Sequence, residues 1–101
     1  MTNKLPISFL VKMADVIKLI GHPQRLQILE HLDLHGECKV SDIVDAVGGQ
    51  QGAISQHLNK MRRAGIIECQ RHGKQVCYTI VAANAVTILN CLRKNHCQAA
   101  K

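Results

Sequence analysis

One face of the segment from Gln51 to Arg63 carries side chains that can hydrogen-bond to the edges of DNA bases. On a helix with about 3.6 residues per turn, the apolar residues Ile54, Leu58 and Met61 share one side. Amides can pair with adenine in the major groove, guanidinium groups with guanine, and hydroxyls with a base or a phosphate. The polar side contains Gly52, Gln56, Asn59 and Arg63, flanked by Ser55, Lys60 and Arg62.

Any solvent-facing helix surface is polar, so this pattern also fits a helix without a partner. Gly52 favours the binding interpretation, because glycine weakens a helix and suits positions where the backbone approaches another molecule closely. Farther along the chain, Arg71, His72 and Lys74 gather around Gly73 at the expected tip of a β-hairpin. There they can reach phosphates or the minor groove, although hairpin tips are often polar without binding anything.

The charge is concentrated in the second half of the chain. Eight of the 13 Lys and Arg residues follow Gln50 and are accompanied by one acidic residue, Glu68, whereas the first half has five basic and six acidic residues. A basic surface opposite a nearly neutral one is typical of proteins that bind a polyanion. A solvated charged surface is the alternative.

Five cysteines offer a second kind of chemistry, because thiolates bind soft acceptors such as As(III), Sb(III) or Cu(I). Cys91 and Cys97 lie six residues apart, and on an ideal helix they point about 120° apart. They converge only if the helix frays near Asn95 or another thiol joins them. Arg93 and Lys94 would lower a thiol pKa, which suits a redox sensor equally well.

The remaining cysteines have simpler interpretations. Cys38 precedes a helix N-terminus and is a third candidate sensing residue. Cys69 and Cys77 lie on the two expected strands of the β-hairpin. With a turn at His72 and Gly73 they face opposite sides of the hairpin, and a shift of one residue places them opposite each other. Small thiols packed as apolar groups are the alternative for all of these cysteines.

Several helices must position these groups. Residues 7–20 form an apolar helix, and Pro23 begins a second one that ends near His35. Ser41 is the expected N-cap of a short helix ended by Gly48, and the polar helix then runs from about Gln50 to Ala64. After the hairpin, a helix from about Ala82 to Asn95 has an apolar face. The first and last helices have more apolar surface than one chain can bury, which suggests a dimer.

Length and composition exclude several classes of protein. The 101 residues predict one domain spanning 1–101, and Phe9 and Tyr78 are the sole aromatic residues, which argues against single-strand binding by base stacking. The sequence has neither a signal peptide nor a membrane span, so we expect a cytoplasmic protein that does not bind membranes. No nucleophile, base and oxyanion donor form a recognisable arrangement, and we therefore expect no enzyme.

The element order, together with the motifs HPQRLQIL, SQHLNKMRRAGII and RHGKQVCYTI, resembles the ArsR/SmtB family of winged-helix repressors over nearly the whole chain. The resemblance implies a mainly α winged helix-turn-helix fold with about five helices and a two-stranded β-hairpin wing. It also implies a homodimer, formed through the first and last helices, that binds an inverted-repeat operator in double-stranded DNA and dissociates when an inducer binds. By the same resemblance, the DNA-contacting residues are Gln51, Ser55, Gln56, His57, Asn59, Arg71 and Lys74.

The family's known inducer sites match this chain incompletely. The Cys-x-Cys positions of the arsenic and lead type are Lys39 and Ser41 here, with Cys38 one place away. The zinc type places Asp and His where this chain has Asn84 and Val86. The persulfide-sensing type uses two cysteines. Cys97 matches one of them, but this chain has Glu30 at the position of the other. Some arsenic sensors use cysteines near the end of the last helix, which Cys91 and Cys97 resemble loosely.

The sequence therefore predicts a DNA-binding repressor released when thiols bind a metalloid, such as As(III) or Sb(III), or another thiophilic metal ion, or are oxidised or persulfidated. The candidate sensing residues are Cys91, Cys97 and Cys38. The alternative is a winged-helix module for protein interaction, or for thiol-based metal binding, without a specific operator.

Overall fold

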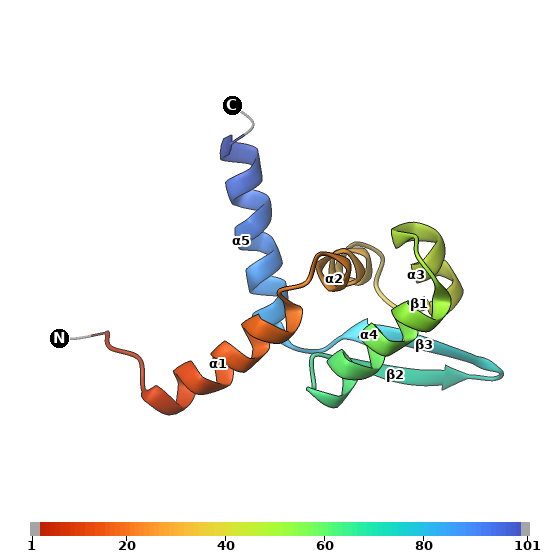
Figure 1. The fold of residues 1–101 in the computed structure, drawn as a ribbon, viewed down its shortest axis with the longest axis horizontal. Helices are drawn as coiled ribbons and strands as arrows, with labels where there is room; N and C mark the ends of the chain where they lie inside the picture. The colour runs from red at the N-terminus through yellow and green to blue at the C-terminus, as the bar shows by residue number, and fades with distance from the viewer. Residues whose placement is uncertain (1–2, 100–101) are drawn as a thin grey trace.

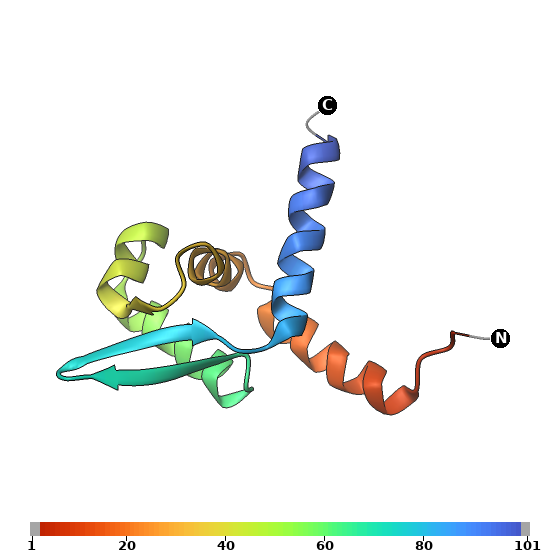
Figure 2. The same ribbon diagram turned by 180° about the vertical axis from the view of Figure 1, so that it is seen from behind.

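The computed structural model describes residues 3–99 and is mainly helical, with one small antiparallel sheet. The elements follow in the order α1 (Ile7–Ile20), α2 (Pro23–His35), β1 (Cys38–Lys39), α3 (Val40–Val47), α4 (Gln51–Arg63), β2 (Ile67–His72), β3 (Gln75–Ile80) and α5 (Ala83–Ala99). Figures 1 and 2 show α1 and α5 projecting from a central body, with the β2–β3 hairpin at the other end. The predicted winged helix-turn-helix fold is confirmed, with a third short strand in addition.

The core lies between helices α2, α3 and α4 and the base of the sheet. Ile54, Leu58 and Met61 recur at helical spacing and are fully buried on one face of α4, as predicted. Burial of each such side chain contributes about 1.5–3 kcal/mol relative to an exposed one. The buried cluster contains Ile20, Ile28, Leu29, Leu32, Cys38, Ile43, Ile54, Leu58, Met61, Ile66, Ile67, Ala85 and Leu89. This packing fixes the rotation of α4 and therefore decides which of its residues face outward.

A tight turn joins α3 to α4. Gly48 and Gly49 have φ angles of 77° and 90°, which residues with a Cβ rarely adopt, and the Gly48 N–H caps α3 by donating to the Val44 carbonyl.

The start of α3 differs from the prediction: the N-cap is Lys39 rather than Ser41. Because Lys39 is still paired with Cys77 in the sheet, the chain passes from strand β1 directly into the helix, and Ser41 lies within the first turn.

Strand β1 was not predicted, and it makes the wing part of a three-stranded sheet in the order β1–β3–β2. The predicted hairpin turn at His72 and Gly73 is wrong by one residue, since β2 continues to His72 and β3 begins at Gln75. Gly73 therefore occupies the first position of the two-residue turn, where its φ of 66° fits. Positive φ at that position alone is the pattern of a type II′ turn.

Helices α1 and α5 leave much apolar surface exposed. Ile20 is the only buried residue of α1, and Phe9, Leu10, Val11 and Ile17 are each more than 40% exposed. The Asn84 amide, which donates to Met13 Sδ at 3.2 Å, places the two helices next to each other. These projecting helices raise the radius of gyration to 15.0 Å, compared with about 13 Å for a compact domain of this size.

The last helix is longer than predicted, because it continues past Asn95 to Ala99. Its first half packs on the body through Ala85 and Leu89, while Leu92 is 46% exposed. An ion pair between Arg93 Nη1 and Asp33 Oδ2, at 2.7 Å, fixes the middle of α5 against α2. The second half of α5 extends away from the body (Figure 1).

Candidate DNA-binding surface and cysteine sites

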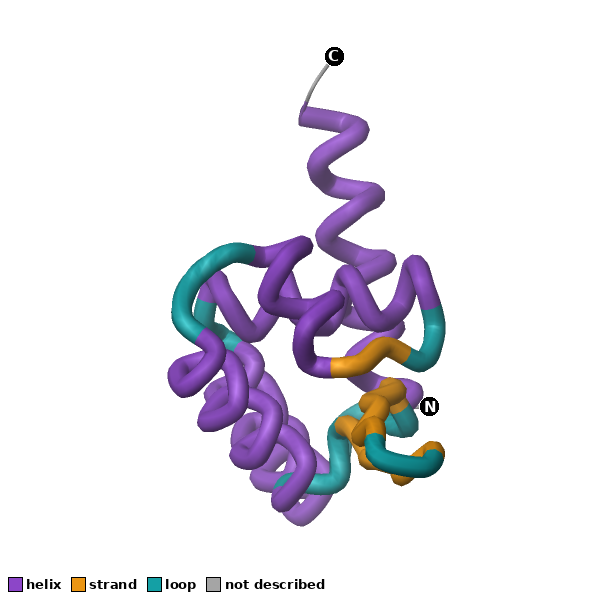
Figure 3. The backbone as a smooth tube through the Cα atoms, turned by 90° about the vertical axis from the view of Figure 1, so that its right-hand side faces the viewer, coloured by secondary structure: helices purple, strands orange, loops and turns teal. Residues whose placement is uncertain are grey.

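The outer face of α4 carries the predicted polar residues. Seven of the candidates on this helix are exposed, and Ser55 and His57 are half-buried. The strands, coloured orange in Figure 3, lie on one side of the helical body. The exposed candidates are Gln51, Gly52, Gln56, Asn59, Lys60, Arg62 and Arg63.

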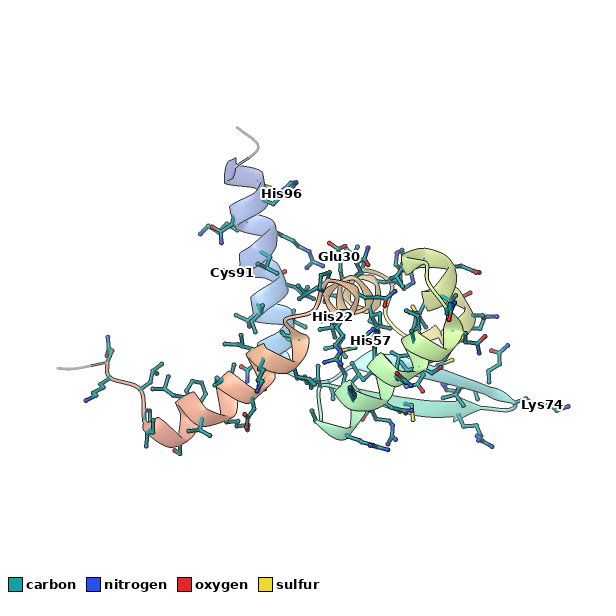
Figure 4. The ribbon with its side chains drawn as sticks, viewed as in Figure 1. His22, Glu30, His57, Lys74, Cys91 and His96 are labelled. Atoms are coloured by element: carbon teal, nitrogen blue, oxygen red, sulfur yellow. The ribbon has the colours of Figure 1, made fainter. Side chains whose placement is uncertain are left out.

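His57 faces inward and joins α4 to α2. The Arg25 Nε donates to His57 Nδ1 at 3.0 Å, and His57 Nε2 lies 3.1 Å from Gln24 Oε1. The His22 ring packs against the His57 ring with a centroid separation of 4.6 Å. Both residues are labelled in Figure 4. Burial lowers the pKa of His57, and the positive charges of Arg25, His22 and Lys60 lower it further.

The network around His57 extends to α1 and to the turn between α3 and α4. Arg25 Nη1 donates to the Leu19 carbonyl in the last turn of α1 at 2.7 Å. Gln24 Nε2 donates to the Gly48 carbonyl, in the turn before α4, at 3.4 Å. His57 therefore holds the orientation of α4 relative to α1, α2 and the turn, an arrangement that suits a positioning residue.

The hairpin presents its basic residues at the end of the molecule far from α1 and α5. Arg71 and Lys74 are both exposed, and Lys74 extends from the tip of the hairpin in Figure 4. His72 has a different role from its neighbours, because its Nε2 contacts Glu37 Oε2 at 3.0 Å and connects the hairpin to the loop before β1. Lys74 and Arg71 therefore remain the basic side chains of the wing that point to solvent.

The three candidate sensing thiols do not meet within one chain. Cys38 is buried in the core, where its Sγ lies 3.4 Å from the Gly36 carbonyl oxygen. Burial raises the pKa of the Cys38 thiol, and the nearby Asp42, Cys77 and Glu37 raise it further. Such a thiol is a poor nucleophile, because the thiolate is the reactive form.

Cys91 and Cys97 are both exposed on α5. The helix does not fray at Asn95 but continues through it, so the two side chains keep the divergence expected on a regular helix. Asn95 Nδ2 lies 3.6 Å from Cys91 Sγ. Glu30, at the position that the persulfide type fills with a thiol, lines a groove between α2 and α5 together with Leu92 and His96 (Figure 4).

The wing cysteines adopt neither of the two expected registers. Cys69 is opposite Tyr78, and Cys77 is opposite Gln70. Directly paired residues share a face of the sheet and neighbours along a strand alternate, so Cys69 and Cys77 lie on opposite faces. A disulfide between them would require a different pairing of the strands.

Known proteins similar to this chain are regulators of transcription. Residues 22–68 match the family model described as bacterial regulatory protein, arsR family. The biofilm growth-associated repressor of Xylella fastidiosa is 33% identical over 86 residues, which cover 85% of this chain and 75% of the relative. The transcriptional activator HlyU of Vibrio cholerae is 31% identical, with 87% of this chain and 81% of the relative covered.

The fold comparison agrees. The crystal structure of the transcriptional repressor BigR from Xylella fastidiosa superposes with a TM-score of 0.84 and 31% identity, covering 93% of this chain and 95% of BigR. Within residues 3–99, none of the helices has the length and apolar character needed to cross a bilayer. The chain belongs to the ArsR family of bacterial regulatory proteins and is a DNA-binding transcriptional regulator rather than an enzyme.

Proposed function

We propose that this protein is a homodimeric repressor that binds an inverted-repeat operator in double-stranded DNA through α4 and the wing. The observation that carries the proposal is the division of α4, whose apolar side is fully buried while its amide and guanidinium groups face solvent. A helix fixed in this way presents a constant set of donors and acceptors to the major groove. The residues proposed to contact DNA are Gln51, Gly52, Ser55, Gln56, Asn59, Lys60, Arg62 and Arg63 of α4 and Arg71 and Lys74 of the wing.

His57 has a separate part in this proposal. The family resemblance assigns it to the DNA-contacting residues, but both of its ring nitrogens are engaged by α2. It therefore acts on DNA binding by holding α4 in position, which brings its neighbours Gln56 and Asn59 to the groove.

The exposed apolar surfaces of α1 and α5 support a homodimer. Phe9, Leu10, Val11 and Ile17 of α1 are exposed in the single chain, and two copies can cover these surfaces by pairing their first and last helices. A twofold dimer places its two recognition helices about one helical turn of DNA apart. The proposed operator therefore contains two related half-sites, and the dimer would act in the cytoplasm, where bacterial promoters are found.

Cys91 and Cys97 are the proposed sensing residues, because their exposed thiols lie on the helix through which the subunits would pair. Within one chain the two thiols diverge, so the sensing site needs thiols from both copies. A metalloid such as As(III) or Sb(III), another thiophilic ion, or oxidation or persulfidation of these thiols would change the pairing of α5. Cys38 would contribute only if the core around β1 opened.

A gel-shift experiment with the DNA flanking the gene tests the proposal and its rival. At moderate salt the repressor is expected to form a complex with this DNA. Unrelated competitor DNA of equal length should not displace the protein from that complex. A module without an operator would bind both DNAs equally. As(III), Sb(III) and a persulfide are then added in turn, and the effective inducer releases the wild type but not the Cys91→Ser/Cys97→Ser variant, which keeps its affinity for DNA.

A further inference from the structure

Three side chains of different metal-binding character meet where the wing joins the body. They are the Glu37 carboxylate, the His72 imidazole and the Cys77 thiol, and their ligand atoms all lie within 4.8 Å of one another. His72 Nε2 lies 3.0 Å from Glu37 Oε2. The three residues come from the loop before β1, the end of β2 and the middle of β3.

The sheet register explains why these side chains converge. Cys77 pairs with Gln70 on one side and with Lys39 on the other, and His72 pairs with Gln75. Since residues two apart on a strand share a face, Cys77 lies on the same face as His72. Glu37, two residues before Lys39, lies at the edge of that face. Cys69 lies on the opposite face, which makes it a matched control.

We propose that Glu37, His72 and Cys77 form a binding site for a divalent ion of the zinc class. One carboxylate, one imidazole and one thiolate are the ligand types that Zn(II) takes, with bonds of about 2.0–2.3 Å. Tetrahedral bonds of that length place the ligand atoms about 3.3–3.8 Å apart. The present separations, 3.0 Å between Glu37 and His72 and at most 4.8 Å within the set, lie on both sides of that range. Rotation of the three side chains about their χ angles can therefore bring the ligand atoms to it.

The surroundings suit a reversible site. Glu37 and His72 are exposed, with 39% and 54% of their side-chain surfaces accessible, so an ion can enter from solvent. Three protein ligands leave the fourth tetrahedral position for water. The carboxylate and the thiolate together balance the charge of the ion, while Lys39, which pairs with Cys77, opposes a cation. The expected affinity is therefore below that of a four-ligand structural zinc site.

A bound ion at this position would connect the hairpin to the loop between α2 and β1. The hairpin is already paired with β1, which follows this loop. It contacts Glu37 of the loop itself through the exposed Glu37–His72 pair, and exposed ion pairs contribute little. Metal binding to the folded chain stabilises it in proportion to the logarithm of the metal concentration. This predicts a melting temperature that rises with added Zn(II).

Titration of the reduced, metal-free protein with Co(II) tests the site. The Cys91→Ser/Cys97→Ser variant serves as the parent, so that thiols of α5 cannot contribute. One Co(II) per chain is expected to produce a thiolate-to-metal charge-transfer band that excess Zn(II) removes. Cys77→Ser abolishes this band, whereas Cys69→Ser retains it. His72→Gln and Glu37→Gln each weaken Co(II) binding by at least about 10-fold, since loss of an outer-shell partner alone costs about 10–100-fold.

Three results would overturn the proposal: no thiolate band in the parent at millimolar Co(II), a band that survives Cys77→Ser, or equal loss in Cys69→Ser. Circular dichroism checks that each variant is folded. Should Cys77→Ser fail to fold, the exposed His72→Gln decides the question, because unchanged Co(II) and Zn(II) affinities in that variant would exclude the site. The increase in melting temperature with Zn(II) must disappear in the same variants.

Discussion

Arg25 Nε donates a hydrogen bond to His57 Nδ1 at 3.0 Å, and this contact joins α2 to the inner side of α4. Arginine can only donate, so His57 Nδ1 must accept and the ring proton must be on Nε2. That proton is donated to Gln24 Oε1, at 3.1 Å. The orientation of α4 therefore depends on a neutral imidazole in one tautomer.

Replacing His57 with Ala should weaken both the fold and DNA binding. The Arg25 Nε and the Gln24 carbonyl lose their partner, which costs about 1–2 kcal/mol of the free energy of unfolding. Urea denaturation measures this loss, and fluorescence anisotropy with operator DNA measures the accompanying drop in affinity. Asn59→Ala is the control on the exposed side of the same helix. It should reduce DNA affinity while changing the free energy of unfolding by less than about 0.5 kcal/mol.

Stability should depend on pH through His57. Its pKa is lowered in the folded chain by burial and by the positive groups around it. The unfolded chain therefore takes up this proton first as the pH falls. The contribution of neutral His57 is complete above the unfolded pKa of about 6.5, and it declines as the pH falls towards the lower folded value.

The urea concentration at the midpoint of unfolding, compared between about pH 7.5 and pH 5.5, measures this effect. The His57→Gln variant keeps a donor and an acceptor but cannot titrate, so its midpoint should fall less than that of the wild type. Equal decreases in the two proteins would mean that other groups cause the pH dependence.

Gly52→Ala should separate fold stability from DNA binding. Nothing lies within 4 Å of a Cβ built at Gly52, and alanine is favoured over glycine within a helix by about 1 kcal/mol. The variant should therefore unfold at higher urea concentration. If the backbone of α4 approaches DNA at this position, the added methyl group costs about 1 kcal/mol of binding, or about fivefold in Kd. Anisotropy tests this, and an unchanged Kd would remove Gly52 from the contact surface.

The thiols should differ in reactivity according to their surroundings. Cys38 is buried and its pKa is raised, whereas Cys69, Cys91 and Cys97 are exposed. Alkylation of the native protein at about pH 8, followed by peptide mass spectrometry, should modify Cys38 at least about 10-fold more slowly than Cys91. In urea the rates should become equal. Rapid alkylation of Cys38 in the native state would show that the core around β1 opens readily.

The sequence was most informative where one repeating pattern decides the structure. The spacing of Ile54, Leu58 and Met61 predicted both the helix α4 and the side that it buries. Pro23 correctly indicated the start of α2, and the apolar run at residues 7–20 corresponds to α1. These features depend on periodicity and local backbone preference, which a single sequence contains.

Features that depend on distant pairing were missed. The two residues of β1, Cys38 and Lys39, have no strand pattern and become a strand only because β3 lies beside them. The same pairing moved the start of α3 ahead of Ser41. The hairpin register depended on which position of the turn Gly73 occupies, and both turn positions were compatible with the sequence. The convergence of Glu37, His72 and Cys77 follows from these pairings and was missed with them.

The most direct test of whether α4 and the wing bind DNA together is to measure operator affinity at several salt concentrations. The variants compared are Arg63→Ala in α4, Lys74→Ala in the wing and Lys4→Ala as the control. Lys4 is exposed before α1 and carries the same charge. Loss of a base contact at Arg63 should cost about 1–3 kcal/mol of binding free energy. Loss of a phosphate contact at Lys74 should weaken specific and nonspecific binding alike and reduce the salt slope by about one. If both variants bind the operator as tightly as Lys4→Ala at every salt concentration, neither α4 nor the wing is the DNA-binding surface.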